Sequence, residues 1–188
     1  MVELSLTGLI LAGGKSRRMG RDKALLLYHN RTFLECCQKL LQDIGCSEIY
    51  VSSNTLANSI PDNYVDIGPV AGIEAVLCHL NNQNYQGLVI VLPVDMVNMT
   101  TRSLQSLIQA IGHYDLVAYY NNPLPMVMRC NSLNADRVSA MAQQASCQGG
   151  MSIKSMSHSL NSITIPILET EDLLNINTPS DLEQFIHE

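Results

Sequence analysis

The segment that most constrains the fold is Leu88–Leu92, five apolar residues in succession that end at Pro93. An unbroken apolar run of this length is typical of a strand that is buried on both of its faces. Leu4–Leu11 is a second, largely apolar run, and it ends at the glycine pair Gly13-Gly14. A sheet whose strands are buried on both faces needs helices on both sides, so these two segments favour an α/β protein.

Helix-like and strand-like segments alternate along the rest of the chain. Apolar residues at helical spacing, together with capping residues, predict helices at Phe33–Ile44, Val70–Leu80, Thr101–Ile111 and Asn134–Ala145, and after Thr178-Pro179. Short apolar segments predict further strands at Glu48–Ser52, Leu116–Tyr120, Val127–Met128 and Ile163–Ile167. Because strands that alternate with helices form parallel sheets, we predict a three-layer, doubly wound α/β fold with a mostly parallel sheet. The length of 188 residues fits a single domain over residues 1–188.

The composition excludes several classes of protein. Hydrophobic residues make up 46% of the chain and charged residues 15%, which is ordinary for a folded protein. The net charge of −6 argues against non-specific binding of nucleic acid. The chain has no apolar run of about 18 residues and no signal-peptide pattern at its start, so we expect a cytoplasmic protein without a membrane span. The six cysteines lack the spacing of a zinc site, and we interpret them as small buried hydrophobic residues.

The segment after the first strand combines glycines with cations. Five of the eleven Lys and Arg residues lie between Lys15 and Lys23. Gly14-Lys15-Ser16 resembles the end of a P-loop, but the required earlier glycine is replaced by Leu9, and the glycine spacing does not fit a dinucleotide fingerprint either. Backbone N–H groups freed by glycine can approach an anion closely, and cations strengthen the local field. We therefore interpret the loop as an anion site; the alternative is a solvated surface cluster.

Two aspartates are expected at strand ends. Asp95 follows the Leu88–Leu92 strand, and Asp66 stands after Val65 and before Gly68. In open α/β sheets, ligands bind beyond the carboxyl ends of the strands. Mg²⁺ is usually held by one or two carboxylates and by substrate phosphates. A basic glycine loop together with such carboxylates predicts a metal-assisted reaction on a nucleoside triphosphate. The alternative interpretation of Asp95 is that it is an ordinary turn residue.

These residues resemble the signature of a known family, the molybdenum cofactor guanylyltransferases. The segment from Leu11 to Lys23 carries two glycines, an Arg-Met-Gly and an Asp-Lys in the family's order. Three further segments are similar to family motifs: Asp66–Gly72, Pro93–Asp95 and Asn175–Leu182. The resemblance spans residues 9–182 and implies a Rossmann-like nucleotidyltransferase fold.

The resemblance implies a transfer of GMP from GTP to molybdopterin-bound molybdenum, the molybdenum cofactor, which yields the guanine dinucleotide cofactor and pyrophosphate. It also implies Mg²⁺ bound by Asp95, catalytic roles for Lys23 and Asp95, and an acceptor side at Asn175 and Asn177. The nucleotide site that it implies consists of Leu11, Ala12, Gly13, Gly14, Arg17, Lys23, Ser52, Asp66 and Asp95. GTP and the molybdenum cofactor are the expected partners, with molybdoenzymes or their chaperones as candidate protein partners.

Three departures from the family pattern bear on this site. Ser52 stands where the family often has asparagine, a single residue separates Asp66 from Gly68, and Gly149-Gly150 stands where relatives often have arginine. Two alternatives to guanylyl transfer remain. One is a related nucleotidyltransferase that uses CTP or a sugar-phosphate acceptor, and the other is a non-catalytic carrier of a nucleotide or cofactor. The glycine at position 13 favours the guanylyl branch, because the cytidylyl branch typically has alanine there.

Overall fold

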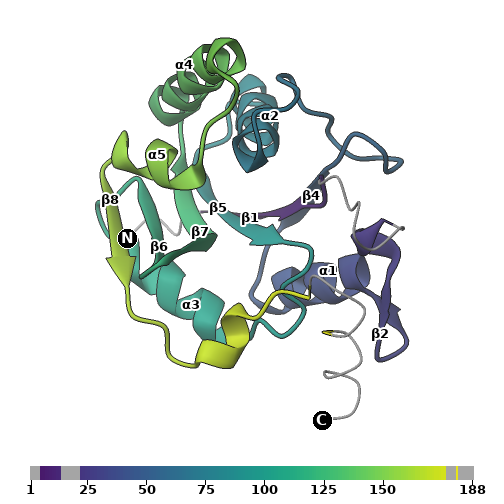
Figure 1. The fold of residues 1–188 in the computed structure, drawn as a ribbon. Coiled ribbons are helices and arrows are strands. Elements are labelled where there is room, and N and C mark those ends of the chain that lie inside the picture. The colour runs from purple at the N-terminus through teal and green to yellow at the C-terminus, as the bar shows by residue number, and fades with distance from the viewer. Residues whose placement is uncertain (1–4, 14–21, 177–180, 182–188) are drawn as a thin grey trace.

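The fold is seen in a computed structural model that describes residues 5–13, 22–176 and 181 (Figure 1). Its centre is a six-stranded sheet with the strand order β4-β1-β5-β7-β6-β8. The strands are β1 (Ser5–Leu11), β4 (Glu48–Ser52), β5 (Gly87–Pro93), β6 (Leu116–Tyr119), β7 (Asn122–Cys130) and β8 (Ser162–Ile165), and β2 (Leu27–Tyr28) pairs with β3 (Arg31–Thr32) in a separate hairpin. The helices are α1 (Phe33–Asp43), α2 (Pro69–Asn82), α3 (Thr101–Ala110), α4 (Ser132–Gln148) and α5 (Ile153–His158), with short 3₁₀ turns η1 (Lys23–Leu25) and η2 (Thr170–Leu173).

Parallel pairing dominates the sheet. β1 pairs in parallel with β4 and with β5, and β6 pairs in parallel with β8. β7 is antiparallel to both β5 and β6. The predicted α/β fold with a mostly parallel sheet is therefore confirmed, and the carboxyl ends of β1, β4 and β5 lie at one edge of the sheet.

The layers explain why β5 is apolar along its whole length. Leu88, Ile90 and Leu92 pack in one cluster with α1 and α3. Val89 and Val91 pack in a second cluster with α2, α4 and α5, which cover the opposite face of the sheet in Figure 1. A strand between two helical layers has no face toward solvent, so the side chains on both of its faces must be apolar.

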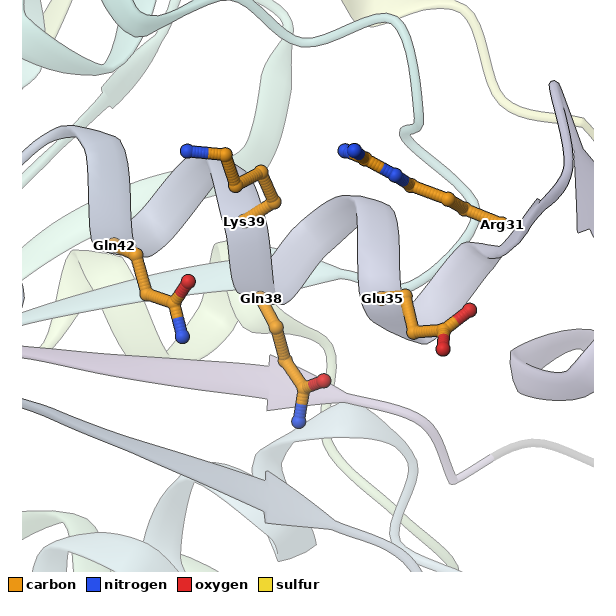
Figure 2. A pocket seen from close by; sticks show the side chains of 5 residues that line it. All are labelled: Arg31, Glu35, Gln38, Lys39 and Gln42. Atoms are coloured by element: carbon orange, nitrogen blue, oxygen red, sulfur yellow. The ribbon is translucent and has the colours of Figure 1, made fainter.

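The local sequence sets the N-terminal boundary of helix α1, and the outer face of this helix is polar. Thr32 Oγ1 accepts a hydrogen bond from the N–H of Glu35 at 3.2 Å, and Glu35 Oε2 accepts one from the N–H of Thr32 at 2.7 Å. This reciprocal capping box satisfies two backbone donors that have no partner inside the helix. Figure 2 shows the polar outer face, where a shallow hollow of about 270 Å³ is lined by Arg31, Glu35, Gln38, Lys39 and Gln42.

The structure differs from the sequence-based expectation in the segment before Asp66. The expected strand end at Asp66 is wrong, because residues 61–67 contain no strand and only Ile60 bridges to β4. Pro61 has no N–H with which to continue a ladder. The next N–H, that of Asp62, donates to Asn54 Oδ1 at 2.9 Å instead. The segment that carries Asp66 is therefore a series of turns.

Other differences concern short elements and chain ends. The strand expected at Leu116–Tyr120 ends at Tyr119, and Tyr120 is exposed. Helix α5 and the β2–β3 hairpin are too short for hydrophobic periodicity to indicate them. The helix expected after Thr178-Pro179 lies outside the described residues.

All six cysteines are free thiols, but their burial varies. Cys37 and Cys130 are buried, as expected, whereas Cys147 is exposed and the other three are half-buried. The interpretation of all six as buried residues therefore holds for two of them. Within the part of the chain that the structure describes, no helix is both long enough and apolar enough to span a bilayer.

Candidate active site

Three strand ends converge at the carboxyl edge of the sheet. Ala12, directly after β1, donates its N–H to Ser52 O at the end of β4 at 3.0 Å. Val94, directly after β5, donates its N–H to Leu11 O at 3.1 Å. These two bonds extend the parallel ladders beyond the strands. The start of the glycine loop, Leu11 to Gly13, is therefore held between the end of β4 and the loop after β5.

Lys23 and Asp95 form an ion pair at this edge. Lys23 Nζ lies 2.8 Å from Asp95 Oδ2, and the two side chains are 17% and 18% exposed. Asp95 stands in the loop after β5, and Lys23 begins η1, whose next residue, Ala24, is fully buried. A pair this far withdrawn from solvent is screened by salt less than a surface pair. The two residues expected to carry catalysis are thus in direct contact.

Asp22 fixes the path of the chain just before Lys23. Asp22 Oδ1 accepts a hydrogen bond from the N–H of Ala24 at 3.1 Å, and its Oδ2 accepts one from the Thr55 hydroxyl at 3.2 Å. Asp22 therefore ties η1 to the segment that follows β4. Sequence reasoning gave Asp22 no role, although aspartate is a preferred residue at the start of a helical turn and could have indicated one.

The loop that carries Asp95 rests on a buried thiol of α1. Cys37 Sγ lies 3.8 Å from Pro93 O and 3.6 Å from Val94 O. Burial raises the pKa of the Cys37 thiol, and the neighbouring Cys36 and Asp95 raise it further. The thiol is therefore neutral near pH 7 and acts as a small packed group with a weak donor, not as a nucleophile.

Ser52 is buried and engaged by a second carboxylate. It is 2% exposed, and its hydroxyl donates to Asp62 Oδ1 at 3.4 Å. Asn54 Nδ2 donates to Asp62 Oδ2 at 2.8 Å and holds that carboxylate from the other side. Asp62 and Asn54 belong to no motif that the sequence revealed. The Ser52 hydroxyl, at the end of β4, is thus already hydrogen-bonded to a carboxylate of the protein, that of Asp62.

Helix α2 approaches the ends of β1 and β4 closely at Gly72. A Cβ atom at position 72 would lie 2.2 Å from Ser52 Oγ and 3.1 Å from Leu11 Cδ2. Any side chain would force these atoms apart, so glycine is required for this contact. The last glycine of the Asp66–Gly72 motif therefore has a packing role at the candidate site.

Replacement of Gly72 with alanine is expected to destabilise the protein by about 1–3 kcal/mol, the usual cost of overpacking a core. Gly13→Ala is the matched control, because within the described part of the chain a Cβ atom there would meet only Ser52 O, at 3.8 Å. Thermal unfolding of both variants measures the difference, and we expect a lower Tm for Gly72→Ala alone. An unchanged Tm in Gly72→Ala would contradict the close approach of α2.

Asp66 lies in a turn that contacts the connection between α4 and α5. Its φ is 62° and its side chain is exposed. A Cβ atom at position 150 would lie 3.7 Å from Asp66 O, and the N–H of Met151 donates to Ile67 O at 3.3 Å. Gly150 has a φ of 120°, a conformation that favours glycine. Two departures from the family pattern, the short segment at Asp66 and the glycine pair that includes Gly150, are therefore in contact.

The C-terminal segment reaches the same edge of the sheet. Ile176 is fully buried, and its N–H donates to Asp95 O at 3.1 Å. The exposed Asn175 directly precedes it, so this expected acceptor residue stands beside the backbone of Asp95. The remaining expected site residues, Gly14, Arg17 and Asn177, lie outside the described residues.

Asp95 is the expected metal ligand, and its surroundings fit Mg²⁺. Within residues 5–13, 22–176 and 181, no group of three or more His, Cys, Asp or Glu side chains could hold a metal ion. In the same part of the chain, only Lys23 hydrogen-bonds to the Asp95 carboxylate, through Oδ2. One carboxylate at a strand end suits Mg²⁺, because this ion takes most of its other ligands from phosphates and water.

Solved structures of other proteins share this fold. The structure is similar to that of molybdopterin-guanine dinucleotide biosynthesis protein A from Archaeoglobus fulgidus, with a TM-score of 0.74, 21% identity and coverage of 96% of this chain and 97% of that chain. It is also similar to 2-C-methyl-D-erythritol 4-phosphate cytidylyltransferase from Thermus thermophilus, with a TM-score of 0.67, 15% identity and coverage of 99% and 98%. Identities this low show the fold alone.

Sequence comparison then identifies the family. Residues 8–160 match the family described as MobA-like NTP transferase domain. The chain is 33% identical over 185 residues to the molybdenum cofactor guanylyltransferase of Xanthomonas euvesicatoria. The aligned residues make up 97% of this chain and 95% of that relative. It is 29% identical over 196 residues to a probable molybdenum cofactor guanylyltransferase of Rhodopirellula baltica, and the alignment covers 94% of this chain and 90% of that relative. The chain therefore belongs to the MobA-like NTP transferase family and is a nucleotidyltransferase, as the motifs predicted.

Proposed function

We propose that this protein transfers GMP from GTP to the molybdenum cofactor and releases pyrophosphate. An oxygen of the acceptor's phosphate forms a bond to the α-phosphorus of GTP, while the bond between that phosphorus and the leaving pyrophosphate breaks. The observation that carries the proposal is the 2.8 Å Lys23–Asp95 pair beside the glycine turn. Support also comes from relatives along the whole chain that are named molybdenum cofactor guanylyltransferases.

The loop after β1 is assigned to the nucleotide. Among the described residues, a Cβ atom at Gly13 would meet Ser52 O alone, at 3.8 Å, which supports a close approach of the nucleotide to the backbone there. By the family pattern, Leu11 to Gly14 and Arg17 contact the nucleotide, and Lys23 contacts its phosphates. Ser52 contributes through its backbone, which accepts the N–H of Ala12. We assign the exposed Asp66 to guanosine.

Lys23 and Asp95 are assigned to the chemistry. When bound by Asp95, Mg²⁺ supplies Lewis-acid stabilisation of negative charge on the phosphate oxygens. Lys23 orients the Asp95 carboxylate through the 2.8 Å bond, and its charge opposes the charge that develops on the leaving pyrophosphate. Charges that are already fixed before the reaction need little reorganisation during it.

The acceptor is assigned to the side of Asn175 and Asn177. The bond from the Ile176 N–H to Asp95 O supports this assignment, because it fixes Asn175 beside the metal ligand. Molybdoenzymes or their chaperones are the partners that we propose to receive the product. We place the reaction in the cytoplasm, where a reducing environment keeps thiols such as the six free cysteines reduced.

Turnover of GTP with the molybdenum cofactor tests the proposal. We expect the guanine dinucleotide cofactor and pyrophosphate to form in the presence of Mg²⁺ and not after its removal by a chelator. GTP with Mg²⁺ is also expected to raise the Tm more than CTP does, because a ligand that binds only the folded state stabilises it. A rise in Tm without turnover would favour a carrier, and faster turnover of CTP would favour a cytidylyltransferase.

Gly13→Ala is expected to reduce the preference for GTP over CTP. The φ of Gly13 is not in the left-handed region, so the added methyl group brings bulk without backbone strain. Excluding a well-fitted base costs about 1–3 kcal/mol, or roughly ten- to two-hundred-fold in kcat/KM. The measurement is the ratio of kcat/KM for GTP to that for CTP in both proteins. An unchanged ratio would show that other residues determine the choice of base, and the turn at Asp66 would be the first candidate.

A further inference from the structure

The segment that joins β8 to Ile176 is anchored at two residues. Among residues 168–176 only Asp172 and Ile176 are buried, with 4% and 0% of their surface exposed. In Figure 1 this yellow segment runs past α3 toward the loop that follows β5. Its path therefore depends on what these two residues contact.

Asp172 is bound at the first turn of α3. Its Oδ2 accepts hydrogen bonds from the hydroxyl groups of Thr100, at 2.6 Å, and Ser103. Thr100 is the N-cap of α3, and its Oγ1 also accepts the N–H of Ser103 at 3.3 Å. A carboxylate is favourable at a helix N-terminus, and burying it is tolerable only when its hydrogen bonds are made. This contact is therefore directional and fixes the register of the segment on the helix.

The other anchor is the candidate metal ligand itself. The Ile176 N–H donates to Asp95 O, and Asp95 stands in the loop between β5 and α3. The same loop ends at Thr100, and its Met96 and Met99 are buried, so it packs as part of the core. Both anchors thus hold the C-terminal segment against the β5–α3 loop and the first turn of α3. Asn175 lies between the two anchors in the sequence.

We propose that Asp172 is a positioning residue for the acceptor: it holds residues 173–176 in one register on the β5–α3 loop and so fixes Asn175 relative to Asp95. The inference rests on the proposed function, which assigns Asn175 to the acceptor side. Arg102 and Glu169 join the same two elements at 3.6 Å, but both are exposed, and an exposed pair contributes little. Asp172 is the polar anchor that is withdrawn from solvent.

Replacement of Asp172 with alanine removes the acceptor of both hydroxyl groups. The KM for the molybdenum cofactor is expected to rise about tenfold, because a small displacement of a binding group weakens its contact with the ligand. The KM for GTP is expected to stay within about twofold of the wild type, since the nucleotide loop is not involved. Amide hydrogen exchange over residues 170–176 is expected to be faster, because the segment has lost one anchor.

Glu74 provides a matched control. It is also a buried carboxylate, 2% exposed, and it accepts hydrogen bonds from Asn63 Nδ2 and Ser139 Oγ, each at 3.0 Å. It lies on α2, on the opposite side of the sheet from α3. Glu74→Ala is expected to lower the Tm while leaving the KM for the molybdenum cofactor and the exchange of residues 170–176 unchanged.

Two milder variants decide the matter if Asp172→Ala does not fold. Asp172→Asn keeps one carbonyl oxygen, and Ser103→Ala removes one donor. Both should therefore raise the KM for the molybdenum cofactor and the hydrogen exchange of residues 170–176, by smaller amounts than Asp172→Ala. An equal rise in both KM values, or unchanged exchange over residues 170–176, would overturn the positioning role. A wild type that does not use the molybdenum cofactor would overturn the proposed function, and the inference with it.

Discussion

Replacement of Asp95 with asparagine is expected to lower kcat by about 10²–10³-fold, a loss similar to that of one preorganised hydrogen-bond donor in an oxyanion hole. Asparagine has the same shape, so the fold should remain intact. The neutral amide is a much poorer ligand for Mg²⁺, and it loses the ion pair with Lys23 at 2.8 Å. Initial rates measured across a Mg²⁺ titration give both kcat and the apparent affinity for the metal.

Asp43→Asn is the matched control for this substitution. Asp43 is an exposed carboxylate on α1 that pairs with Lys39, away from the carboxyl edge of the sheet. Its replacement is expected to leave turnover at the wild-type level. Near-wild-type turnover of Asp95→Asn at saturating Mg²⁺ would show that Asp95 is not the metal ligand.

Lys23→Ala is expected to lower kcat/KM for GTP by a similar factor of about 10²–10³. The substitution leaves the Asp95 carboxylate, which is only 18% exposed, without its cation. It also removes a charge that we assign to the phosphates. Lys15→Ala is the comparison, because Lys15 stands in the same basic loop but outside the Asp-Lys motif. Equal, small effects of the two substitutions would indicate that the cluster acts only as a diffuse field.

The double variant Lys23→Ala/Asp95→Asn separates the two roles of Lys23. If Lys23 acts only by orienting Asp95, the double variant should be no slower than Asp95→Asn, because residues that work as a unit are not additive. If Lys23 also neutralises phosphate charge, the double variant should be slower than either single variant. We expect the second result, with a loss smaller than the product of the two single losses.

The layers and the central contact of the site could be predicted from the sequence because their signals are local. The apolar run of β5 reveals a strand between two helical layers, and that strand is confirmed. Lys23 and Asp95 stand 72 residues apart, yet each belongs to a short motif at the end of a strand. Because the carboxyl ends of parallel strands meet at one edge, the fold class alone brings these motifs together.

Residues that act through tertiary contacts could not be predicted in this way. Asp172 is also 72 residues from Thr100, but no motif marks it, and its burial depends on where the chain passes after β8. The same holds for Asp62, whose partners, Ser52 and Asn54, are known only once the turn is formed. The expected strand end at Asp66 is a different kind of error. Pro61 was visible in the sequence, and its missing N–H already argued against a strand there.

The contact between Gly150 and the turn at Asp66 limits how parts of this protein can be exchanged with those of its relatives. An arginine grafted at position 150 would place a side chain on a backbone with a φ of 120°, and its Cβ would start 3.7 Å from Asp66 O. A chimera that inherits such an arginine with the short turn at Asp66 would carry a side chain, in contact with that turn, on a backbone conformation that favours glycine. Recombination within the family should therefore treat these distant stretches of sequence as one module.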